Sequence, residues 1–119
     1  MSVEDRLALV IEDDPAQQDI FSQAIKMAGF TVEAISNGDK ALQRLQEVTP
    51  QLVILDLHLP IVSGDEILAA IRADERLASV PVILATADPI LAEALSDSSD
   101  LVLLKPISFN QLRDLASRF

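Results

Sequence analysis

The chain has 119 residues, half of them hydrophobic, and its 19 acidic and 9 basic residues give a formal net charge of −10. This size predicts one compact domain over residues 1–119, with a core that needs neither metals nor disulfides. The charge argues against direct binding to nucleic acid or to an anionic membrane, and the lack of cysteine and of a long apolar segment predicts a soluble, cytoplasmic protein.

Five short apolar runs alternate with five amphipathic stretches along the chain. The first run stops at three acidic residues and Pro15, and proline suits the first turn of a helix. The helix that follows is expected to bury Ile20 and to end at Gly29. The second run contains Glu33 and is expected at an edge of the sheet. In chain order, the runs predict strands at residues 7–11, 31–35, 52–56, 81–86 and 101–104.

The second half of the chain continues this alternation. The third run is apolar without interruption up to Asp56, as expected for a strand buried on both faces. The fourth helix, residues 88–95, has room for barely two turns, and the last helical pattern runs from Phe109 to Phe119. Strands that alternate with helices require parallel pairing and right-handed crossovers, so we predict an α/β fold with a doubly wound five-stranded sheet between two helical layers.

Four of the five predicted strands end at polar side chains. These are Glu12 and Asp13 after the first strand, Asp56 at the end of the third, Thr86 at the end of the fourth and Lys105 after the fifth. Ligand sites of open α/β sheets lie at such strand ends, where the winding reverses, so these groups share a crevice if the first and third strands are neighbours. Three carboxylates that close together need a cation, and hard oxygen ligands favour Mg²⁺.

This set of groups suits phosphoryl transfer. The Asp56 carboxylate can act as the nucleophile, Mg²⁺ and Lys105 can neutralise the phosphoryl oxygens, and the Thr86 hydroxyl can bind one of them. Taken alone, Asp56 would be interpreted as an acid that ends a strand and caps a loop, and it is the convergence of the other groups that favours a functional role. Glu12 and Asp13 could likewise cap the first helix, but we assign that role to Asp14.

The sequence resembles the response regulator receiver domain of two-component signalling over essentially its whole length. The motifs that carry this resemblance are Glu12-Asp13, the Asp56-Leu57-His58-Leu59-Pro60 turn with Gly64, Thr86-Ala87 and Lys105-Pro106. The resemblance implies a flavodoxin-like three-layer sandwich with strand order 2-1-3-4-5.

The resemblance also implies an acceptor and a set of metal ligands. Asp56 would take a phosphoryl group from a phosphohistidine on a histidine kinase or a histidine phosphotransfer protein, and would lose it by slow self-dephosphorylation rather than by enzymatic turnover. Asp13 would bind Mg²⁺ directly and Glu12 through water. Asp56 and the backbone carbonyl of His58 would complete the protein ligands.

The remaining motifs imply a switch. Lys105 would pair with the phosphoryl group and would be held by a cis peptide bond to Pro106. Thr86 would move toward the phosphorylated aspartate. This movement would shift the population toward a second conformation of the surface formed by helix four, strand five and helix five.

Two departures from the family lie on this output surface. Val102 occupies a position three residues before Lys105 where an aromatic ring is usual, and the 19 positions from Thr86 to Lys105 are a few fewer than usual. The apolar run 101–104 should form the other sheet edge, so we consider a homodimer through the helix four, strand five and helix five surface. The alternative is that helices four and five bury this strand.

Other functions stay open on the sequence alone. A haloacid dehalogenase-like phosphatase uses similar groups, but it needs a second aspartate where this chain has His58. A nucleotide- or flavin-binding module lacks a glycine-rich loop after the first strand. A degenerate receiver would act only as a docking module. The His58 side chain could be a general base or a metal ligand. We expect instead that it faces solvent near the site and modulates the access of water to the acyl phosphate.

Overall fold

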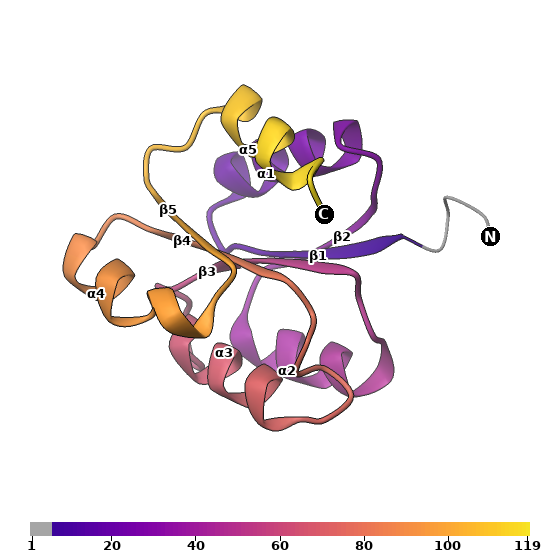
Figure 1. Cartoon of the computed structure of the whole chain (residues 1–119), viewed down its shortest axis with the longest axis vertical. Helices are drawn as coiled ribbons and strands as arrows, with labels where there is room; N and C mark the ends of the chain where they lie inside the picture. Colours follow the sequence, from indigo (N-terminus) through magenta and orange to yellow (C-terminus); the bar gives the residue numbers. More distant parts are fainter. Residues whose placement is uncertain (1–5) are drawn as a thin grey trace.

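Parallel strands and helices alternate along the chain (Figure 1). The structure is a computed structural model that describes residues 6–119, so residues 1–5 of the predicted domain lie outside the described residues. The strands are β1 (Leu7–Ile11), β2 (Thr31–Ile35), β3 (Leu52–Asp56), β4 (Val82–Thr86) and β5 (Leu101–Leu104). The helices are α1 (Pro15–Met27), α2 (Gly38–Glu47), α3 (Gly64–Ala73), α4 (Pro89–Ala94) and α5 (Phe109–Ala116), with a 3-10 turn, η2 (Ser96–Ser98), before β5.

The five strands form one parallel sheet in the order β2-β1-β3-β4-β5, which confirms the predicted topology. The strand with Glu33 lies at one edge, as expected, and β5 lies at the other. In the register of the central strands, Ile11 pairs with Leu55 and Asp56 pairs with Ala85. The winding reverses between β1 and β3, so the carboxyl ends of these two neighbouring strands flank the switch point at which α/β sheets bind ligands.

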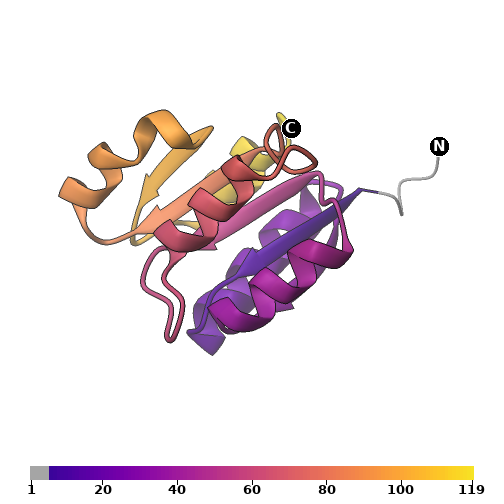
Figure 2. The same cartoon turned by 90° about the horizontal axis from the view of Figure 1, so that it is seen from below.

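Each face of the sheet is covered by its own helices. Alternate residues of a strand point to opposite faces, so Leu9 and Ile11 pack with α2 and α3 whereas Ala8 and Val10 pack with α1 and α5. Figure 2 shows α2 and α3 crossing the near face of the sheet. The central strands therefore need apolar side chains at every position, which explains why β3 reads as an uninterrupted apolar run.

Two side chains predicted from the helical spacing to be buried are exposed. Ile20 is 44% exposed because the buried stripe of α1 runs through Phe21, Ala24 and Ile25 instead. Phe119 is 38% exposed because α5 ends at Ala116, before the predicted stripe is complete.

The fourth helix is as short as predicted, and the 3-10 turn follows it before β5. Arg72 of α3 holds this turn in place, because its guanidinium donates to the Ser98 carbonyl at 2.8 Å and to the Asp100 carboxylate at 3.1 Å. Val102 is half-buried and packs against the core on the α2 and α3 face. Among residues 6–119, no helix is long and apolar enough to cross a membrane.

Candidate functional site

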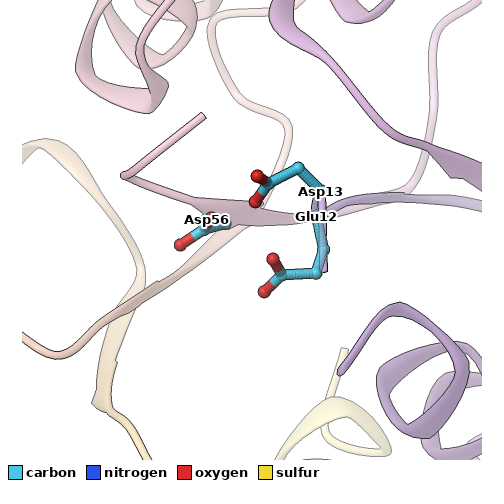
Figure 3. Close-up of side chains that lie close together, drawn as sticks. All are labelled: Glu12, Asp13 and Asp56. Carbon is cyan, nitrogen blue, oxygen red and sulfur yellow. The ribbon is translucent and has the colours of Figure 1, made fainter. Parts of the chain in front are cut away.

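Three carboxylates meet at the switch point of the sheet. Glu12 and Asp13 directly follow β1, and Asp56 is the last residue of the neighbouring β3. Each of them offers an oxygen atom that lies within 4.8 Å of the others, and Figure 3 shows the three side chains gathered at the two strand ends. Glu12 and Asp56 are almost fully buried, with 1% and 3% exposure, whereas Asp13 is exposed. The structure thus brings together the acids that the sequence placed at strand ends.

Lys105 joins this cluster from the end of β5. Its ammonium lies 2.8 Å from Glu12 Oε1 and 3.2 Å from Asp56 Oδ1, and its side chain is 16% exposed. Only the contact with Glu12 is aligned as a hydrogen bond, so Asp56 Oδ1 is buried without a hydrogen-bond partner. The peptide bond between Lys105 and Pro106 is cis, as the resemblance implies.

The electrostatics of the cluster favour a further cation. Burial raises the pKa of Glu12 above its usual value, although hydrogen bonds from Lys105 and from the Asp14 backbone act in the opposite direction. Burial by itself would lower the pKa of Lys105, but Glu12 and Asp56 outweigh it and raise this pKa. Lys105 therefore stays protonated, and its ammonium pairs with two members of a cluster of three carboxylates.

The loop after β1 is fixed by local hydrogen bonds. Asp14 caps α1, because its Oδ2 accepts from the Gln17 N–H at 2.9 Å, which is the role assigned to it from the sequence. The Asp14 N–H donates in turn to Glu12 Oε2 at 3.1 Å. The cap thus orients the Glu12 carboxylate toward the cluster while leaving its other oxygen for Lys105.

Thr86 ends β4 beside the cluster and is fully buried. Its Oγ1 accepts from the Asp88 N–H at 3.0 Å and lies 3.2 Å from Nε2 of His58. The sequence did not indicate this contact, because the two residues are 28 positions apart and the exposed His58 belongs to a loop without periodicity. None of the hydrogen bonds found in residues 6–119 joins Thr86 to Asp56.

Gly64 lets the α3 N-terminus approach the backbone that carries Asp56. A Cβ on Gly64 would overlap the Asp56 carbonyl oxygen and lie 2.6 Å from Leu57 Cα. We expect Gly64→Ala to lower the free energy of unfolding by about 1–3 kcal/mol, because backbone must move to relieve the overlap. Urea unfolding would measure this loss, with the adjacent exposed Asp65→Ala as a control expected to change stability by less than about 1 kcal/mol. A Gly64→Ala variant as stable as the wild type would show that the approach is not tight.

Fold and site together define a doubly wound α/β domain with an acidic cluster at its switch point. The family model for the response regulator receiver domain matches residues 8–117. The chain therefore belongs to the receiver domains of two-component signalling, which confirms the predicted family and fold. Receiver domains are signalling modules rather than classical enzymes, and the match disfavours the phosphatase alternative.

Relatives with this domain differ in length. The probable methanogenesis regulatory protein FilR2 of Methanothrix harundinacea is 36% identical over 118 residues, which cover 90% of this chain and 76% of that protein. The DNA-binding dual master transcriptional regulator RpaA of Synechocystis is 35% identical over 109 residues, which cover 87% of this chain and 44% of that protein. This chain thus spans less than half the length of RpaA.

Solved structures show the same fold. The receiver domain of the sensor histidine kinase PA1611 from Pseudomonas aeruginosa superimposes with a TM-score of 0.84 over 95% of each chain, at 24% sequence identity. That structure has a magnesium ion coordinated in its active-site cleft.

Proposed function

We propose that Asp56 accepts a phosphoryl group from the phosphohistidine of a histidine kinase or a histidine phosphotransfer protein. An Asp56 carboxylate oxygen forms the new O–P bond while the N–P bond of the phosphohistidine breaks, and the imidazole nitrogen keeps the electron pair and takes up a proton. The observation that carries this proposal is the convergence of two further acids and one lysine on a buried aspartate at the switch point.

The donor set of the cluster fits Mg²⁺. Carboxylate oxygens are the ligands that this ion prefers, and the buried Asp56 Oδ1 has no hydrogen-bond partner of its own. We assign direct binding to Asp13, Asp56 and the backbone carbonyl of His58, and binding through water to Glu12. When bound, the ion would neutralise negative charge on the phosphoryl oxygens. Lys105 lies at ion-pair distance from Asp56 and would pair with the same oxygens.

Replacing Asp13 by Asn tests the metal assignment. We expect the metal-free variant to be more stable than the wild type by up to about 1 kcal/mol, because one of three crowded negative charges is removed. We also expect its affinity for Mg²⁺ to fall about tenfold or more. Urea unfolding and calorimetric titration with Mg²⁺ would measure the two effects.

Asp14→Asn is the matched control for this prediction. It removes the same charge one residue further on, and Asn caps a helix about as well as Asp. Unchanged Mg²⁺ affinity in Asp13→Asn, or an equal loss in both variants, would contradict the assignment of Asp13 as a ligand.

The switch and the output surface complete the proposal. A phosphoryl group on Asp56 would attract the Thr86 hydroxyl, and Thr86 leads directly into the loop before α4. The surface formed by α4, β5 and α5 carries exposed apolar side chains, Ile90 at 81% and Leu104 at 50% exposure, to which a protein partner could bind. Val102 stands where the family usually has an aromatic ring, so transmission would have to proceed without that ring.

A homodimer through this surface stays a prediction. Leu104 at the open edge of β5 supports it, whereas burial of Leu103 in the core shows that the helices already cover part of the strand. Light scattering that shows a monomer at high concentration, both with and without a phosphoryl mimic, would contradict it. Two other expectations likewise stay predictions. They are that the chain does not contact nucleic acid or membranes directly, and that it is located in the cytoplasm.

Incubation with acetyl phosphate and Mg²⁺, followed by intact mass measurement, distinguishes the candidate functions. We expect each chain to gain one phosphoryl group and to lose it slowly after the reagent is removed. Continuous turnover of a small phosphate ester such as p-nitrophenyl phosphate would instead support a phosphatase. A chain that gains no phosphoryl group would be a degenerate receiver that acts only by docking.

A further inference from the structure

The hydroxyl of Thr86 has an unusual partner for a buried group. A threonine hydroxyl carries one proton and two lone pairs. One lone pair accepts the N–H of Asp88 at 3.0 Å, and the oxygen also lies 3.2 Å from Nε2 of the exposed His58. Because Thr86 is fully buried, its proton needs an acceptor, and in the described part of the chain Nε2 of His58 is the acceptor within reach.

The arrangement that gives every group of Thr86 a partner has the hydroxyl donating to Nε2 of His58. The Asp88 N–H already supplies a donor to Oγ1, so the remaining need of the hydroxyl is an acceptor for its proton. Nε2 can accept that proton when the imidazole is neutral and carries its own proton on Nδ1. In this arrangement a loop side chain at the surface holds a buried hydroxyl at the end of β4.

We propose that His58 is a positioning residue that holds the Thr86 hydroxyl away from Asp56 in the unphosphorylated chain, and that phosphorylation must break this hydrogen bond. The proposal rests on the function proposed above for Asp56. Oxygens of a phosphoryl group are acceptors, so they compete with His58 for the single proton of Thr86. The side chain of His58 thus sets the ratio of two states of Thr86, one in which the hydroxyl donates to His58 and one in which it donates to the phosphoryl group. The backbone carbonyl of His58, which we assign as a metal ligand, takes no part in this competition.

The strength of one hydrogen bond gives the expected effect. Loss of an ordinary hydrogen bond changes an equilibrium about fivefold. Without the imidazole, Thr86 is free to turn to the phosphoryl group, so we expect His58→Ala to bind beryllofluoride, a noncovalent phosphoryl mimic, about fivefold more tightly than the wild type in the presence of Mg²⁺. Since His58 is exposed, its removal leaves no cavity in the core.

The experiment is a double-mutant cycle read by calorimetric titration with beryllofluoride and Mg²⁺. It compares the wild type, His58→Ala, Thr86→Val and the double variant, with Gln51→Ala as a control. Gln51 is exposed and precedes β3 at the opposite end of the sheet, so its truncation should leave the affinity unchanged. We expect His58→Ala to tighten binding in the wild-type background and to have no effect in the Thr86→Val background.

A second readout observes the His58→Ala variant without a ligand on Asp56. The Asp88 N–H donates to Thr86 Oγ1, so its NMR signal reports the position of that oxygen. In His58→Ala without beryllofluoride, this signal should move part of the way toward its position in the saturated wild type. A merely structural role of His58 would not move the signal in that direction.

The outcomes separate this inference from the proposed function. If the wild type binds the mimic and gains a phosphoryl group, but His58→Ala binds it no more tightly, the positioning role is wrong and the function of Asp56 stands. The role is also wrong if His58→Ala tightens binding equally when Thr86 is Val. If the wild type neither binds the mimic nor gains a phosphoryl group, the proposed function and this inference both fail.

Discussion

Asp56→Asn is expected to abolish phosphorylation by acetyl phosphate and to leave the fold intact. The amide lacks the anionic oxygen that attacks phosphorus, and none of the described hydrogen bonds depends on Asp56 Oδ1. The side chain is 3% exposed, and its charge lies beside two other carboxylates and 3.2 Å from the Lys105 ammonium. The substitution removes this ion pair but also relieves the repulsion, and Lys105 keeps its hydrogen bond to Glu12, so we expect little change in stability. Intact mass after incubation with Mg²⁺ and acetyl phosphate would measure the loss.

The control for this prediction is again Asp14→Asn, which removes one exposed acid of the same loop and keeps the helix cap. That variant should gain one phosphoryl group, as the wild type does. A phosphoryl group on the Asp56→Asn variant would mean that another residue is the acceptor, and unfolding of the variant would mean that Asp56 is a structural residue.

Lys105→Met is expected to cause the largest loss of stability in the site. Lys105 is the cation closest to Glu12, whose carboxylate is 1% exposed, and removing it leaves a buried charge without its partner. Breaking a buried pair in this way typically costs about 3–5 kcal/mol, and the partial exposure of Lys105 places the expected loss near the lower value. Methionine keeps the length of the stem, so the effect should come from the charge rather than from lost packing.

Mg²⁺ gives this prediction its control. An ion bound by the same acids supplies the missing positive charge, so saturating Mg²⁺ should reduce the stability difference between Lys105→Met and the wild type. Urea unfolding with Mg²⁺ and with EDTA would measure both differences. An equal loss under the two conditions would show that Lys105 stabilises the chain through packing and not through the charge of the cluster.

The order of strands and the composition of the acidic cluster could be predicted because both follow from local patterns. Uninterrupted apolar runs indicate strands buried on both faces, and a polar residue that ends each run lies at the edge where parallel strands place ligand sites. Asp56 and Thr86 were found in this way. The resemblance to receiver domains added roles to these positions, and the match over residues 8–117 confirms the family.

Features that depend on side-chain geometry could not be predicted. The spacing of α1 did not show that Ile20 falls just outside the buried stripe, and that of α5 did not show that the helix ends before Phe119. The aligned hydrogen bond of Lys105 to Glu12 rather than to Asp56 depends on side-chain angles that a sequence pattern does not contain. The contact of His58 with Thr86 joins a loop to the end of β4, and only the folded sheet brings these two segments together.

The central claim is that the acids around Asp56 bind a divalent cation, and that this cation makes the aspartate a phosphoryl acceptor. The most direct test is the rate at which acetyl phosphate adds a phosphoryl group to the wild type, followed by intact mass, in Mg²⁺ and in EDTA. We predict one phosphoryl group per chain in Mg²⁺, mapped to Asp56, and almost none in EDTA. Equal rates under the two conditions, or a phosphoryl group mapped to another residue, would contradict the claim.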